Sequence, residues 1–187
     1  MKLSYLVKGL PGHPLHPPLT DATIGIYTAA SAFGVLSALG VSERNMATAW
    51  WLALVLGLIV TGPTAVTGLI DWLGITWGSP LWRTATVHLL AMVTATVFFL
   101  LAAIFGHGGY VDGEVTAGAL VLNLIGFGAL TLGGWLGGTV VFVHGMRVLN
   151  LVEEPALRAA APVPTPEKEA AAGEQPMDND EREGLTS

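Results

Sequence analysis

Long apolar stretches separated by short polar links dominate the pattern of the chain. Four of them stand out, at about residues 20–41, 47–73, 84–105 and 116–144. Each reaches the ~20 residues that a helix needs to cross the hydrocarbon core of a bilayer, and none shows the alternation of a half-buried strand. Because backbone polar groups in lipid must be satisfied within the segment, the pattern predicts four transmembrane helices.

The links between these stretches are short and carry turn-forming residues. "SERN" (42–45) is polar, "GITWGSPLWR" (74–83) holds Gly, Ser and Pro, and "GHGGYVDGE" (106–114) is rich in Gly. Short links join antiparallel neighbours. The predicted fold is therefore an all-α integral membrane protein, an up-down bundle of four transmembrane helices with a disordered C-terminal tail. No internal repeat is recognisable in the sequence.

The two ends of the chain differ from the apolar part. We place a segment with an "HPLHP" turn at 1–19 and the four-helix membrane domain at 20–150. Residues 151–187 are rich in Pro, Ala and Glu and contain no aromatic residue. Such a segment buries too little apolar area to offset its ordering entropy, so 151–187 is predicted to be a disordered acidic tail.

Composition agrees with a membrane protein. Hydrophobic residues make up 52% of the chain and charged residues 12%, against ~25% charged residues in soluble domains. Cysteine is absent, which excludes thiolate metal sites, Cys-ligated iron–sulfur clusters and a cysteine nucleophile. No basic patch is visible, so no nucleic-acid partner is expected.

Lysine and arginine positions predict the orientation of the bundle. With four crossings, the N-terminus, the 74–83 link and the C-terminus share one side. That side holds five basic residues, namely Lys2, Lys8, Arg83, Arg147 and Arg158, and the other side holds only Arg44. The positive-inside rule then puts both termini in the cytoplasm. Tryptophans are expected in aromatic belts at both interfaces, Trp72, Trp77 and Trp82 on the cytoplasmic side and Trp50 and Trp51 on the far side.

The same topology gathers most histidines in one leaflet. The residues expected on the cytoplasmic side are His13, His16, His88, His144 and the carboxylate Asp71. His107 is expected on the far side, in an exposed Gly-rich loop. Ionisable residues cost ~2.5–3.5 kcal/mol or more near the bilayer centre, so they usually face the bundle interior. The gathering predicts either a shared binding site or a hydrogen-bonded structural cluster, and the sequence favours neither.

Imidazoles on facing helices suit a haem or metal site. The lead hypothesis is a small membrane redox component that binds one haem b near the cytoplasmic face. His88 and His144 are the first candidates for axial ligands, with His16 or His13 in reserve. Groups expected near the propionates are Arg83, Arg147 or a tryptophan.

Two other interpretations stay open. The same leaflet could hold a metal site made of Asp71, His88 and His144, or a pathway that handles protons or metal ions. Alternatively, the cluster only ties helix ends together in a non-enzymatic structural or assembly subunit. No Ser-His-Asp arrangement is visible, and we expect that the chain is not an enzyme on its own.

Two local features have expected structural roles. Asp21 follows Thr20 at the predicted start of the first helix, where a carboxylate favours the helix N-terminus. In the fourth stretch, Gly133 and Gly137 are four residues apart, as are Gly134 and Gly138, and this spacing lets helix backbones approach closely. Packing within the bundle is the favoured explanation for the glycines. A homo-oligomer through this helix, or room for a flat cofactor, is the alternative.

Four segments together resemble a bacterial membrane family, the domain of unknown function 2231. They are "HPLHP" before the first helix, "TGLIDW" ending the second, a histidine early in the third, and "GGWLGGTVVFVHGMRV" ending the fourth. The resemblance covers about residues 12–149 and implies a multi-pass four-helix protein of the bacterial inner membrane. Some relatives are joined to, or encoded beside, Rieske-type iron–sulfur proteins. The resemblance therefore implies a redox setting with a Rieske-type or other redox protein as partner, and it assigns no ligand role to any histidine.

Overall fold

The computed structural model describes residues 14–146, which form antiparallel helices. In chain order these are α2 (His16–Ala38), α3 (Glu43–Leu73), α4 (Pro80–Asp112), α5 (Ala117–Gly138) and the π-helical turn η1 (Thr139–Val143). No strand occurs among these residues, and all four long helices are apolar enough to cross a membrane. The predicted all-α, four-helix membrane bundle is thus confirmed. Outside the described residues lie His13, Arg147, the other terminal basic residues Lys2, Lys8 and Arg158, and the predicted tail 151–187.

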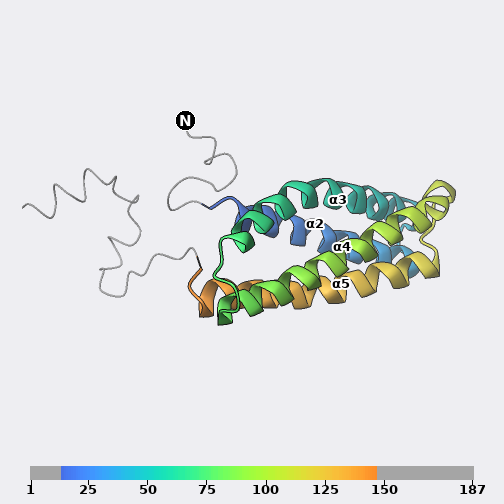
Figure 1. The fold of residues 1–187 in the computed structure, drawn as a ribbon. Coiled ribbons are helices and arrows are strands. Elements are labelled where there is room, and N and C mark those ends of the chain that lie inside the picture. The colour runs from blue at the N-terminus through green and yellow to red at the C-terminus, as the bar shows by residue number, and fades with distance from the viewer. Residues whose placement is uncertain (1–13, 147–187) are drawn as a thin grey trace, which may run out of the picture. The chain divides into compact units, whose positions relative to one another are not determined.

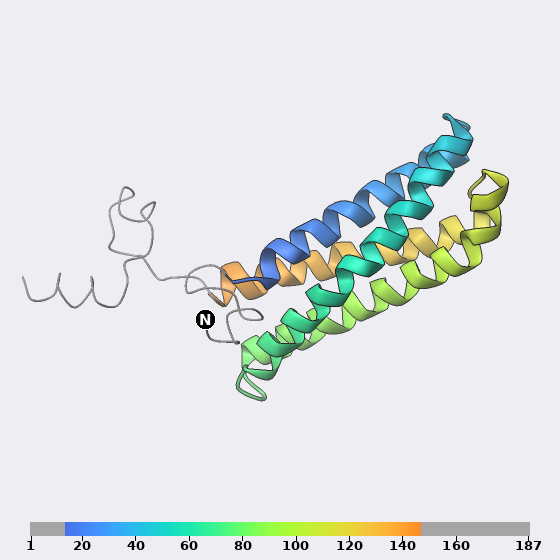
Figure 2. The ribbon, with the colours of Figure 1, turned by 90° about the horizontal axis from the view of Figure 1, so that it is seen from above.

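The bundle consists of two helical hairpins packed against each other. Helix α2 packs along α3, and α4 packs along α5. Contacts of α3 with α4 and of α2 with α5 close the bundle (Figures 1 and 2). One end of the bundle therefore holds the starts of α2 and α4 and the ends of α3 and α5. We call it the histidine end, because His16 begins α2 there and His88 lies in the third turn of α4.

Helix α2 begins four residues before the predicted start. Proline stands in its first turn, where the missing N–H costs nothing because helix N-termini leave those groups unpaired anyway. As a result Asp21 lies in the second turn, and no acidic residue is found in the first. The expectation that Asp21 caps the helix is therefore wrong.

Helix α4 continues through the segment that was predicted to be a loop. The helix runs to Asp112 and ends at Gly113, whose φ of +88° is of the left-handed kind and whose N–H donates to the Gly109 carbonyl at 2.8 Å. Two glycines in this segment serve close packing, because a Cβ atom on Gly106 would collide with the Trp50 ring and one on Gly109 would come within 2.8 Å of the Glu114 carbonyl oxygen. His107 is consequently an exposed helical residue beside Trp51, with ring centroids 5.2 Å apart.

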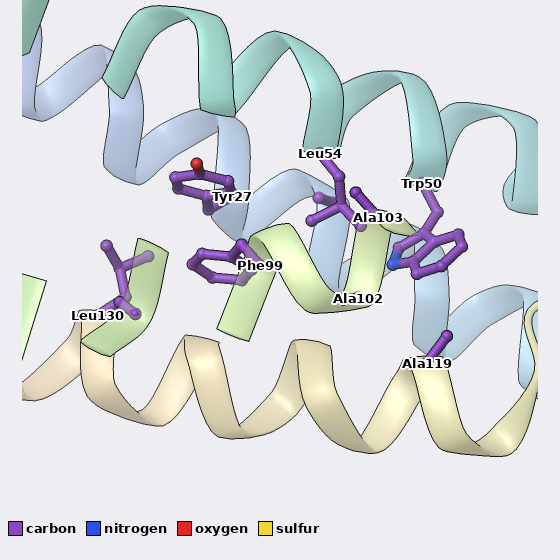
Figure 3. Packing of buried hydrophobic residues seen from close by; sticks show 10 residues of the cluster. Tyr27, Trp50, Leu54, Phe99, Ala102, Ala103, Ala119 and Leu130 are labelled. Carbon is purple, nitrogen blue, oxygen red and sulfur yellow. The ribbon is translucent and has the colours of Figure 1, made fainter. Parts of the chain in front are cut away.

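Large side chains and alanines together fill the centre of the bundle (Figure 3). The prediction that Trp50 lies in an interfacial belt is wrong, since its side chain is fully buried. Its indole N–H donates to Asn123 Oδ1 at 3.3 Å, and Asn123 Nδ2 donates to Ser31 Oγ at 3.0 Å. This polar chain links α3, α5 and α2 inside the core, where unpaired polar groups would be costly.

Candidate functional site

A cavity of about 580 Å³ opens between the helices at the histidine end. Residues from all four helices and η1 line it, and among them are His16, His88 and Asp71. The structure thus brings three of the predicted site residues to one cavity. Asp71 lies close enough to His16 to act on its ring electrostatically.

His16 is held against α3 by two contacts of its Nδ1 atom, one of them with the Thr67 hydroxyl at 3.3 Å. Its Nδ1 lies 3.1 Å from the Thr64 carbonyl oxygen. Because a carbonyl only accepts, Nδ1 carries the proton, and in the neutral ring Nε2 keeps its lone pair. Nε2 is 3.4 Å from the Thr20 hydroxyl. The ring lies so close to α3 that a Cβ atom on Gly68 would come within 2.6 Å of its Cε1 atom.

His88 makes the corresponding contacts with α5. Its Nδ1 donates to the Gly133 carbonyl at 2.7 Å, and a Cβ atom on Gly137 would lie 3.1 Å from its Cε1 atom. Nε2 of His88 has no hydrogen-bond partner within residues 14–146. Both histidines therefore use Nδ1 to bind the second helix of their own hairpin, and among the described residues their Nε2 atoms meet at most the Thr20 hydroxyl, 3.4 Å from Nε2 of His16.

His144 is placed differently from the two cavity histidines. It follows η1, whose π-helical turn is closed by the His144 N–H and the Thr139 carbonyl at 3.1 Å. Its Nε2 lies 3.0 Å from the Thr84 hydroxyl, and it is not among the residues that line the cavity. The exposed Arg83 is not among them either. Of the first-choice pair, only His88 reaches the cavity, and the reserve ligand His16 joins it.

The three residues of the alternative metal site do not all line the cavity. Asp71 and His88 line the cavity and His144 does not. In the described part of the chain, no three His, Asp or Glu side chains are grouped so that they could hold a metal ion. The structure therefore does not bring Asp71, His88 and His144 together as one metal site.

Hydroxyl groups on α2 and α3 form one wall of the cavity, and the sequence analysis did not identify them. Thr23 Oγ1 lies 3.0 Å from Thr64 Oγ1, and the Tyr27 hydroxyl lies 3.0 Å from Thr61 Oγ1. The available signal was the spacing of Thr20, Thr23 and Tyr27 after His16, at steps of three and four residues that share a helix face. On the α4 and α5 side the wall is apolar apart from His88 and Thr96, with residues such as Met92, Ala95 and Leu130.

Glycines of α5 allow the close approach on which the site depends. A Cβ atom on Gly133 would come within 2.5 Å of Met92 Sδ on α4, and Gly137 accommodates the His88 ring. Packing inside the bundle, the explanation favoured from the sequence, thus accounts for these two residues. Gly134 and Gly138 line the cavity, where the absence of side chains leaves room beside the helix.

Comparison with known proteins identifies one family. The family model described as "Predicted membrane protein (DUF2231)" matches residues 12–150. Comparisons with curated proteins and with solved structures gave no significant match.

Proposed function

The chain belongs to the DUF2231 family of membrane proteins, and from this premise we propose that it is a small redox component that binds one haem b between His16 and His88. When bound, the haem would supply one-electron transfer within the bilayer. The proposal retains the cofactor expected from the sequence and replaces His144 by His16 as an axial ligand.

One observation carries the proposal: two histidines from different hairpins line the same cavity with matching hydrogen bonds. Histidines that ligate a metal almost always donate their other ring N–H to a carboxylate, carbonyl or water, which fixes the tautomer and the ring orientation. His16 and His88 both do so, at 3.1 and 2.7 Å from main-chain carbonyls. Neutral Nε2 atoms held in this way would suit the binding of haem iron, which His16 and His88 would then hold.

The remaining lining is compatible with a flat, mostly apolar group. Helix α5 contributes the glycines Gly134, Gly137 and Gly138 to the cavity, so a planar ring can approach its backbone. Trp72 also lines the cavity, and its indole N–H donates to the Thr86 hydroxyl at 3.0 Å. Of the groups expected near the propionates, Trp72 is therefore better placed than the exposed Arg83.

The orientation and the partner follow from the sequence. We place both termini in the cytoplasm, so that the histidine end faces that side, because the basic residues near the helix ends gather there. The bacterial inner membrane as location, and a Rieske-type or other redox protein as electron partner, come from the family resemblance.

The decisive experiment is an optical spectrum of the purified protein. Material from haem-supplemented cells should show a Soret band that shifts on reduction. The variants His16→Asn and His88→Asn keep an amide near the position of Nδ1 and remove Nε2, so they should lose the band and stay folded. His107→Asn, a matched change at the opposite end, should keep it. Wild-type protein that is folded but colourless would contradict the proposal.

A structural or assembly role is the second candidate, and the same hydrogen bonds support it. The His16 ring ties α2 to α3, and the His88 ring ties α4 to α5. If His88 has only a structural role, His88→Ala should lower thermal stability and His88→Asn should restore much of it. The activity of any partner protein should persist in both variants. If His88 binds haem, His88→Asn should lose the Soret band as completely as His88→Ala does. This result distinguishes haem binding from a purely structural role.

A further inference from the structure

The two hairpins of the bundle repeat the same contacts at fixed sequence intervals. Between α2 and α4 the interval is 72 residues, and it relates His16 to His88, Tyr27 to Phe99 and Gly34 to Gly106. The two members of each pair make corresponding contacts. The histidines bind a carbonyl of the next helix, and the aromatic rings fill the core. A Cβ atom on Gly34 would clash with Trp50 of the next helix, and one on Gly106 would come within 3.0 Å of Ala119, which stands 69 residues after Trp50.

The second helices repeat with an interval of 69 residues. Gly68 and Gly137 receive the two histidine rings, and the carbonyls of Thr64 and Gly133, four residues earlier, accept their Nδ1–H groups. The relation extends to the middle of the bundle, as Gly57 and Gly126 show.

A Cβ atom on Gly57 would lie 2.6 Å from the Tyr27 ring, and one on Gly126 would lie 3.2 Å from the Phe99 ring. Three kinds of contact therefore recur at these intervals in both hairpins: the histidine–carbonyl hydrogen bond, the contact of each histidine ring with a glycine, and the contact of each aromatic ring with a glycine.

Equivalent residues meet where a twofold axis along the bundle would pass. The rings of Tyr27 and Phe99 stack with centroids 3.9 Å apart and planes 6° apart (Figure 3). Trp50 and its counterpart Ala119 are both buried, and a large residue opposite a small one lets both occupy the crowded centre.

We infer that residues 16–143 are two copies of one helical hairpin related by an approximate twofold axis, and that His16 and His88 are equivalent donors to a single ligand on that axis. The ligand half of this inference rests on the proposed function. A twofold axis places the two imidazoles at the same depth and on opposite sides of one cavity, which they both line. Two such donors would suit a metalloporphyrin, whose metal His16 and His88 would hold.

The first test concerns the ligand. Haemin titrated into the detergent-solubilised protein should saturate at one molecule per chain. His16→Asn and His88→Asn should weaken binding to a similar extent, each by at least the ~10–100-fold that loss of an outer-shell partner of a metal ligand costs. A stoichiometry of two, or a large defect in only one of the variants, would overturn the equivalence of the donors.

The second test needs no ligand. The chain has no cysteine, so spin labels can be attached at introduced cysteines on exposed helix faces. The twofold relation converts the pair Thr28 and Val121 into the pair Leu100 and Leu52, and all four residues are exposed. Their two label–label distance distributions should match, and clearly different distances would overturn the repeat. If the distances match but the wild-type protein binds no haemin, the proposed function and the ligand assignment are wrong. The repeated hairpin would still be supported in that case.

Discussion

The rings of Tyr27 and Phe99 stack face to face in the centre of the bundle, with their centroids 3.9 Å apart. Tyr27 belongs to the first hairpin and Phe99 to the second, so this contact joins the two halves of the protein. Both side chains are almost completely buried, and each packs onto a glycine of the next helix. Tyr27 is also among the residues that line the cavity.

Removing the second ring should destabilise the bundle strongly. We expect Phe99→Ala to lower the free energy of unfolding by about 3–5 kcal/mol, the usual range for truncating a buried aromatic ring. Tyr27→Phe removes only the hydroxyl contact with Thr61 at 3.0 Å, which should cost about 0.6 kcal/mol, the average for hydrogen bonds inside a membrane bundle. Denaturant titration in detergent measures both values. Similar losses in the two variants would contradict the role given to the stack.

Adding one methyl group to Gly106 should be costly, although alanine is the better helix former. A Cβ atom at this position would collide with the buried Trp50 ring and approach Ala119 to 3.0 Å. We therefore expect Gly106→Ala to destabilise the protein by about 1–3 kcal/mol through overpacking. Gly108→Ala is the matched control, because nothing lies within 4 Å of its Cβ position. A neutral Gly106→Ala would show that this end of α4 packs less tightly than described.

The helices and their order could be predicted from the sequence, because long apolar runs between short links leave few other arrangements in lipid. The burial of Trp50 could not, since an indole near a helix end suits an interfacial belt equally well. Likewise, the glycines of 106–109 could indicate a loop or close packing, and the contact of Gly106 with the buried Trp50 ring could not be foreseen from the sequence.

The candidate site was predictable only in part. The sequence showed which residues share a leaflet, but the choice of His16 over His144 depends on the direction of each side chain. The repeated hairpin was hidden for a related reason. Its two helices repeat at different intervals, 72 and 69 residues, and several equivalent positions differ in residue type, such as Tyr27 and Phe99.

The polar chain in the core should tolerate loss of its central amide poorly. Asn123 accepts from the Trp50 indole and donates to Ser31, with all three side chains buried. We expect Asn123→Ala to cost about 1–3 kcal/mol, because it leaves the indole N–H without an acceptor. Thr131→Ala on the exposed face of α5 removes only a hydroxyl bound to its own helix and should be nearly neutral. If Asn123→Ala is equally neutral, water or another group must satisfy the indole.

Enlarging Gly137 tests whether the position of the His88 ring matters to the site without removing the ligand itself. A Cβ atom there would lie 3.1 Å from Cε1 of His88, so the branched side chain in Gly137→Val must displace the ring from α5. We expect the variant to remain folded, to bind haemin at least ~10-fold more weakly, as loss of an outer-shell contact does, and to show a shifted Soret band. Gly128→Val is the control, because the space around its Cβ position is open within 4 Å. Unchanged haemin affinity and unchanged stability in Gly137→Val would mean that the position of the His88 ring does not depend on this glycine. The close approach of the helices would then not be needed to form the site.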